Sequence, residues 1–169
     1  MHVLKKRLTY LRDREALAAF LLPAVIVYKW QDAGGQVSWG IRLGALFLLS
    51  YILLQGTWYW HLKLRVVANA KPLPAYFHRL FYAFWWSNLA GMGALLAALL
   101  GAGVLSLSSS DIKWCAGLLA GALLEHINYY HYQLMYDTRA AFDFLRRNRR
   151  LRKAALGLDM ARVGQAAPG

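Results

Sequence analysis

Four long apolar stretches dominate this chain of 169 residues and restrict what it can fold into. They cover about residues 15–31, 39–60, 78–107 and 111–136. An apolar helix needs roughly 20 residues to cross a bilayer, and each stretch approaches or exceeds that length. The short connections QDAGGQVS and LSLSSSD favour antiparallel hairpins of neighbouring helices. Between the second and third stretches, Pro72 and Pro74 end any helix.

The composition is that of a membrane protein. Hydrophobic residues make up 59% of the chain and charged residues only 17%, and the mean hydropathy is +0.31. An ordinary soluble domain is less apolar and carries more charge. Cys115 is the only cysteine, which excludes an internal disulfide. The first residues, MHVLKKRLTYLRDRE, lack the apolar core of a removable signal peptide.

The basic residues predict the orientation of the four spans. Of the 20 Lys and Arg residues, 17 lie before the first stretch, between the second and third, or after the fourth. Only Lys29, Arg42 and Lys113 fall on the opposite side. The positive-inside rule therefore places both termini in the cytoplasm, and we expect a bacterial cytoplasmic membrane.

The predicted fold is an all-α integral membrane bundle of four transmembrane helices. Residues 1–137 form the membrane domain, and residues 138–169 form a basic cytoplasmic tail with a C-terminal helix. Arginines of the tail are expected to contact anionic lipid headgroups, because each basic charge near such a leaflet is attracted to it; they are Arg146, Arg147, Arg149, Arg150 and Arg152. Since the net charge of +12 falls between apolar runs and not on one soluble face, no nucleic-acid partner is expected.

The segment LLEHINYYHYQLMYD ends the fourth stretch with an unusual density of polar side chains. Glu125 is the only acid inside any predicted span, and an ionisable group at that depth is normally paired, turned inward or functional. Helical spacing places Asn128, Tyr129 and Tyr132 on its face, with His126 alongside. The other spans offer polar or aromatic groups at the same depth. The candidate ligand-binding residues are Glu125, His126, Asn128, Tyr129, His131, Tyr132, Asn88, Gln55 and Trp85.

Three functions remain open for these residues, beside simple hydrogen bonding between helices. The first is the binding or transport of an amphiphilic or ionic ligand, such as a lipid headgroup, in a site open to the cytoplasmic leaflet. The second is a haem or metal site, possible ligands for which are His126, His131, His61, His78 and Glu125. The third is an accessory role in a larger membrane complex. Catalysis, the cofactor and the oligomeric state stay undetermined.

Small residues predict how two of the spans pack. Gly93, Ala97 and Gly101 recur every four residues in the third stretch, and Gly117 and Gly121 do so in the fourth. Small side chains allow membrane helices to approach closely. We therefore expect these two helices to pack tightly near the outer side, or the same stripe to form a homodimer.

Overall fold

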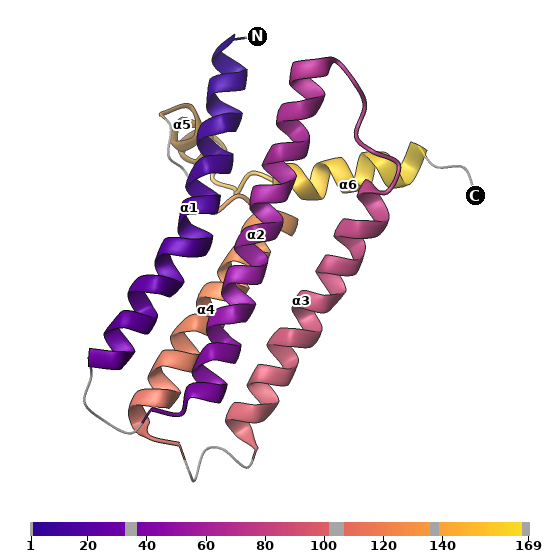
Figure 1. Cartoon of the computed structure of the whole chain (residues 1–169). Coiled ribbons are helices and arrows are strands. Elements are labelled where there is room, and N and C mark those ends of the chain that lie inside the picture. The colour runs from indigo at the N-terminus through magenta and orange to yellow at the C-terminus, as the bar shows by residue number, and fades with distance from the viewer. Residues whose placement is uncertain (1, 33–36, 102–106, 136–138, 167–169) are drawn as a thin grey trace.

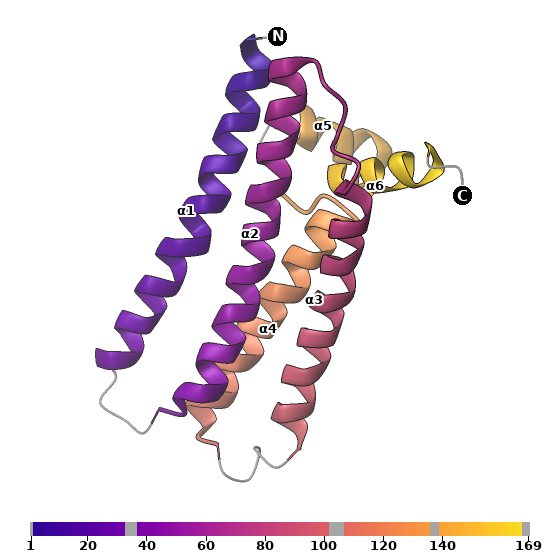
Figure 2. The ribbon, with the colours of Figure 1, turned by 45° about the vertical axis from the view of Figure 1, so that its right-hand side comes forward.

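The computed structural model describes residues 2–32, 37–101, 107–135 and 139–166, and these form six α-helices (Figure 1). Four are long: α1 (His2–Asp32), α2 (Trp39–Asn69), α3 (Phe77–Leu100) and α4 (Ser109–Tyr130). They lie side by side in both ribbon views (Figures 1 and 2). The two short helices, α5 (Arg139–Asn148) and α6 (Ala155–Ala166), lie toward the end where α1 begins. We call this end of the molecule, with the start of α1 and the last residues of α4, the basic end.

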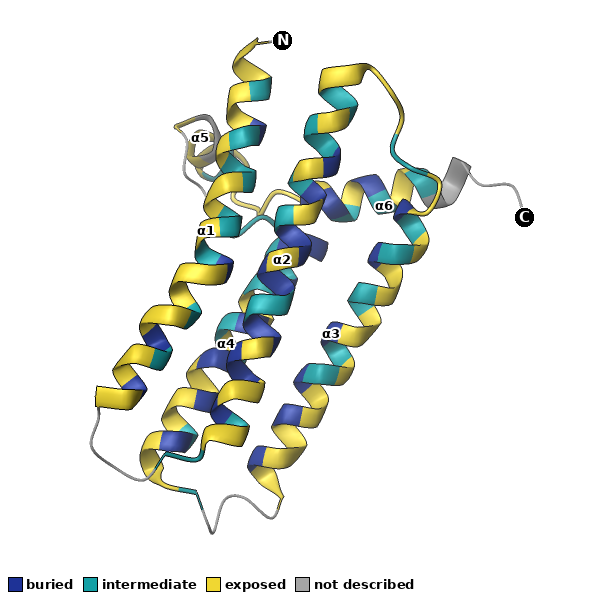
Figure 3. Ribbon diagram, in the orientation of Figure 1, coloured by how far each residue is buried: buried dark blue, intermediate teal, exposed yellow. Residues whose placement is uncertain are grey.

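Helix α2 is the centre of the packing. It contacts α1, α3 and α4, and its buried side chains include Ala45, Leu49 and Ile52. In Figure 3 burial is concentrated on α2 and on the sides of the other helices that face it. Large apolar side chains are nevertheless exposed on all four long helices, for example Phe20 and Phe47. A soluble protein rarely shows so much apolar surface, so this exposure points to a non-aqueous or protein environment.

Two of the described helices, α2 and α3, are long and apolar enough to cross a membrane. The other two long helices carry more polar groups. Helix α1 begins with a strongly charged half, and Lys29 and Asp32 follow its apolar part. Helix α4 carries Asp111 and Lys113 near its start and Glu125 near its end. All-helical structure and two membrane-length helices are thus confirmed, and the four-span topology stays a prediction.

A buried ion pair fixes the end of the molecule opposite the basic end. Arg42 of α2 and Asp111 of α4 are 2% and 1% exposed, and Arg42 Nε lies 2.5 Å from Asp111 Oδ1. The carboxylate also accepts from the Ser108 hydroxyl, 2.8 Å away, in a capping box that begins α4. The Arg42 guanidinium lies over the ring of Trp30 in α1, 5.3 Å from its centroid. One arginine therefore links three helices, and its charge is compensated where it is buried.

The helices differ from the predicted spans in their ends. Helix α1 begins at His2 and α2 continues to Asn69, so both extend beyond the apolar part toward the basic end. Helix α4 stops at Tyr130, six residues earlier than the prediction of 136. It stops because Asn128 Oδ1 accepts from the Leu134 backbone N–H at 2.8 Å, which turns the chain away from the helix axis. Tyr136 lies outside the described residues.

The basic tail is folded into two helices, where one was predicted. Tyr132 pairs with Lys153 in an isolated antiparallel bridge, and the Gln133 backbone N–H donates to the Arg152 carbonyl at 2.8 Å. This pairing closes a loop that contains α5 and brings the chain back to the basic end. Helix α6 then crosses the ends of α3 and α4, which it contacts (Figure 1). Position 157 is a glycine because any Cβ there would overlap the Tyr130 carbonyl.

Candidate ligand-binding site

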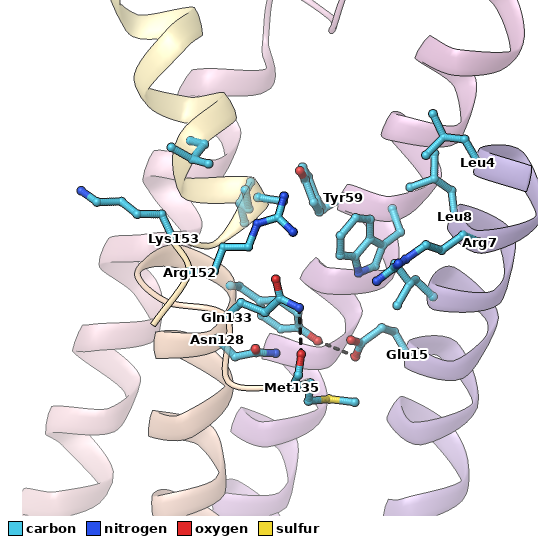
Figure 4. Close-up of a pocket in the computed structure, with 16 residues that line it drawn as sticks. Leu4, Arg7, Leu8, Glu15, Tyr59, Asn128, Gln133, Met135, Arg152 and Lys153 are labelled. Atoms are coloured by element: carbon cyan, nitrogen blue, oxygen red, sulfur yellow. Dashed lines mark hydrogen bonds between the residues drawn. The ribbon is translucent and has the colours of Figure 1, made fainter. Parts of the chain in front are cut away.

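A cavity of about 400 Å³ opens at the basic end, between α1, α2, the end of α4 and the start of α6 (Figure 4). Its size is that of a small-molecule site. Apolar and aromatic residues supply most of the lining, and a smaller set is charged or polar. The charged and polar set consists of Arg7, Glu15, Asn128, Gln133, Arg152 and Lys153.

One face of α1 forms one wall of the cavity. Leu4, Leu8, Leu11 and Glu15 follow each other at intervals of three or four residues, so they project from the same side of the helix. Arg7 belongs to the same wall. The highly charged first half of α1 thus has an apolar stripe with an acid at its inner end, facing the rest of the protein.

The opposite wall comes from the chain that leaves α4 and enters α6. Arg152 and Lys153 precede α6, and Leu156 and Leu158 belong to its first turns. Figure 4 shows the guanidinium groups of Arg7 and Arg152 directed into the cavity from opposite walls, whereas the Lys153 ammonium group points away. Two guanidinium groups that face one space offer several N–H donors to an anion there.

Glu15 is held in place at the inner end of the cavity by Tyr129. The Tyr129 hydroxyl donates a hydrogen bond to Glu15 Oε2 (Figure 4). The phenol ring crosses α2 at Gly56, where a Cβ would overlap it. The Glu125 carboxyl group also interacts with the Tyr129 hydroxyl. A tyrosine of α4 therefore joins an acid of α1 to an acid of its own helix.

Helix α6 is anchored to α2 by one buried carboxylate. Asp159 Oδ2 accepts from the Tyr59 hydroxyl at 2.7 Å and lies 2.7 Å from Lys63 Nζ. Tyr59 also lines the cavity. Because Tyr59 and Lys63 belong to α2, Asp159 fixes the wall of the cavity that carries Arg152 to α2.

A separate polar layer lies between α2, α3 and α4. Gln55 and Asn88 exchange two hydrogen bonds: Gln55 Nε2 donates to Asn88 Oδ1 at 2.8 Å, and Asn88 Nδ2 donates to Gln55 Oε1 at 2.9 Å. The Tyr130 hydroxyl donates to the same Gln55 oxygen at 2.9 Å, and Asn88 Nδ2 lies 3.4 Å from His126 Nδ1. His126 is 2% exposed, and its Nε2 has no hydrogen-bond partner among the described residues. None of these four residues lines the cavity.

The nine predicted ligand-binding residues are therefore divided between two places. Asn128 and Tyr129 line the cavity, while Gln55, Asn88 and His126 belong to the polar layer. The other four lie around these groups: Glu125 is half-buried and accepts from Asn128 Nδ2 at 3.2 Å, the Trp85 ring lies 6.1 Å from the His126 ring, and His131 and Tyr132 are exposed.

The predicted headgroup-binding arginines are also separated. Arg152 lines the cavity. Arg146 and Arg147 lie on α5, Arg149 and Arg150 follow it, and all four are exposed and outside the cavity lining. Arg149 ends α5 with a left-handed backbone conformation, φ 48°.

The proposed metal ligands do not converge. Among the described residues, no group of three or more His, Cys, Asp or Glu side chains is placed to hold a metal ion. The rings of His126 and His131 are 5.6 Å apart, but His61 is exposed at the side of α2 and His78 stacks on Tyr82. The donor set that a zinc or iron site needs is therefore not assembled in the described parts of the chain.

Comparison with known proteins gives no relative. No family model matches this chain, and no curated protein or solved structure matches it. The function must therefore be argued from the site.

Sequence reasoning missed two of the residues that now define the site. Glu15 was placed at the start of the first span and Arg7 in the basic segment before it, and neither was named as a site residue. The signal that could have revealed them is the stripe of Leu4, Leu8 and Leu11, since an apolar face on a charged helical segment indicates contact with protein.

Chemically, the cavity offers guanidinium donors at one level, a carboxylate at another and apolar walls around both.

Proposed function

We propose that this chain is an integral membrane protein with four spans and cytoplasmic termini, which binds an amphiphilic ligand with an anionic headgroup from the cytoplasmic leaflet. The four-span topology draws support from the way α1 and α4 run alongside α2 and α3 (Figures 1 and 2). It also draws support from the exposed apolar side chains on α1 and α4, which suit a lipid environment. They include Leu17, Phe20, Leu21, Val25, Leu123 and Leu124.

The cavity that combines Arg7 and Arg152 with apolar walls carries the functional proposal. The exposed apolar residues of α1 become dense from Leu17 onward, two residues after Glu15 and in the direction away from Arg7, whereas only Val3, Leu4 and Tyr10 are exposed before it. The cavity therefore lies where hydrocarbon gives way to headgroups, with basic residues on the aqueous side. A headgroup can enter at this level while the acyl chain remains along the apolar walls.

Retention of a lipid by purified protein tests this function. We expect native mass spectrometry of the detergent-solubilised protein to detect a bound phospholipid, whose phosphate is the anionic group. Replacing both cavity arginines, Arg7→Gln with Arg152→Gln, should reduce retention about tenfold or more, because charge-assisted hydrogen bonds to the headgroup are lost.

The matched control removes two charges from α5, Arg146→Gln with Arg147→Gln. These arginines are exposed and do not line the cavity. The control should therefore keep most of the bound lipid, since only diffuse attraction to the membrane is weakened. Equal losses in the two double variants would show that the tail attracts lipid without a cavity, and would contradict the proposed function.

A further inference from the structure

We infer that the ligand headgroup is zwitterionic, with an anionic group between Arg7 and Arg152 and an ammonium group at Glu15. This inference rests on the proposed function and specifies the class of ligand. Its basis is that positive and negative groups lie at different levels of the same cavity. In Figure 4 Arg7, Arg152 and Glu15 all direct their charged ends into one space.

The two charges of α1 are arranged along the helix axis. Arg7 and Glu15 are eight residues apart, which is about 12 Å by helical rise, and the arginine side chain is long enough to shorten the distance between the charges. Arg152 belongs to the opposite wall, and its guanidinium group lies at the level of Arg7 and not at the level of Glu15 (Figure 4). A headgroup that reaches from the arginines to Glu15 therefore meets opposite charges at its two ends.

Glu15 is fixed as an acceptor and has capacity for a ligand. Tyr129 donates to Oε2 of the carboxylate, and a carboxylate has about four acceptor positions. The ring of Tyr129 cannot shift easily, because it fills the space over Gly56. A carboxylate held in this way provides a preformed site for the N–H groups of an amine.

The basic neighbour of Glu15 in the chain, Arg14, is outside the cavity lining. Arg14 is exposed and donates to the Tyr10 hydroxyl at 2.5 Å, and its guanidinium lies 5.3 Å from the Tyr10 ring centroid. Glu125 interacts with the same tyrosine hydroxyl as Glu15, so a second carboxyl group lies on this side. An ammonium group is attracted to these carboxyl groups in their ionised form, whereas an anionic group is not.

Two lipids that differ only in the headgroup test the inference. Single-chain phospholipids with the same acyl chain, one with an ethanolamine and one with a glycerol headgroup, are titrated against the full-length protein in detergent. The ethanolamine lipid should bind about tenfold more tightly, the value of one additional charge-assisted hydrogen bond. Glu15→Gln should bring the two affinities close together, because the neutral amide no longer favours an ammonium group.

The Glu15→Gln variant keeps an oxygen that can accept from Tyr129, so the packing of α1 is preserved. Asp13→Asn is the matched control: it removes an acid two residues away that is exposed and outside the cavity, and it should leave the preference unchanged. If the wild type binds both lipids equally, or Glu15→Gln keeps the preference, the zwitterionic ligand is refuted while anion binding stands. If neither lipid binds, the proposed function itself fails.

Discussion

Two amide side chains are buried as a pair at the centre of this protein. Gln55 and Asn88 satisfy each other with two reciprocal hydrogen bonds between α2 and α3. Both are almost completely buried, at 2% and 0% exposure. An amide that loses its partner in such a place bears the full cost of desolvation. This pair therefore fixes the register of two helices that otherwise present apolar faces to each other.

Gln55→Leu tests the polar layer. The substitution leaves both the Asn88 amide and the Tyr130 hydroxyl without their partner, so we expect the protein to lose about 1–3 kcal/mol of stability. The loss is measured as a lower midpoint of denaturation in detergent. Thr57→Val is the control on the same helix, because within the described residues the Thr57 hydroxyl donates to the Leu53 carbonyl of its own helix.

The double variant Gln55→Leu with Asn88→Leu sharpens this test. Replacing both partners by apolar groups removes the unsatisfied amide, so the double variant should lose less stability than the sum of the two single variants. Strict additivity would mean that the two amides do not stabilise each other.

For single residues, sequence patterns identified polar side chains at a similar depth, but not the distant residues with which they form hydrogen bonds. The polar side chains of the fourth stretch and of Gln55 and Asn88 were identified from their depth and spacing. Partners from distant parts of the chain could not be found in the same way. The buried pair of Arg42 and Asp111 joins residues 69 positions apart, and sequence alone placed both at helix ends. Similarly, nothing local connects Glu15 with Tyr129, which lies 114 residues later.

At the scale of secondary-structure elements, the return of α6 to the basic end is the main departure from the predicted fold. A run of arginines suggests an exposed tail, and α5 agrees with that. The chain after it, ALGLDMARVGQA, instead has an apolar side and one acid. Leu156 and Asp159 are buried against the rest of the protein. The partner of this apolar side became visible only in three dimensions.

Asp159→Ala should release α6. The change removes the acceptor of Tyr59 and the counter-ion of Lys63, and we expect a cost of about 2 kcal/mol. Amide hydrogen exchange in the segment of α6 should then be faster by about tenfold or more. The control is Asp143→Ala in α5, an exposed acid. Unchanged exchange in α6 after Asp159→Ala would show that apolar contacts alone hold the helix.

The packing of α3 also departs from the prediction from small residues. Gly93, Ala97 and Gly101 are exposed, and a Cβ at Gly93 or Gly117 would meet nothing. The close approach is at Gly91, where a Cβ would lie 2.8 Å from Leu48 of α2; of the glycines in the predicted stripes, Gly121 makes an ordinary contact, with a Cβ 3.7 Å from Leu49 of α2. Spacing identifies a stripe of small residues, but it does not say which helix the stripe meets. The central position of α2 decides that here.

For the whole molecule, charge and apolar surface are distributed along one axis. The basic end carries the start of α1, the loop after α2 and the two short helices, while most of the exposed large apolar residues lie on the long helices. This distribution follows directly from the sequence, since the basic residues cluster between apolar stretches. It explains why the sequence alone predicts an orientation, with both termini in the cytoplasm, which stays a prediction. The number of spans is harder to predict, because polar residues lower the hydropathy of α1 and α4.

Labelling of single cysteines separates four spans from two. In a Cys115→Ser background, cysteines are introduced one at a time at His2, Asn69 and Ser109, and intact cells are treated with a membrane-impermeant maleimide. With four spans, positions 2 and 69 share the cytoplasmic side, so only Ser109→Cys should react before permeabilisation. If α2 and α3 alone crossed the membrane, positions 2 and 109 would share one side and position 69 would lie on the other. Reaction of positions 2 and 109 together, or of position 69 alone, would therefore contradict the four-span topology and the cytoplasmic placement of the cavity with it.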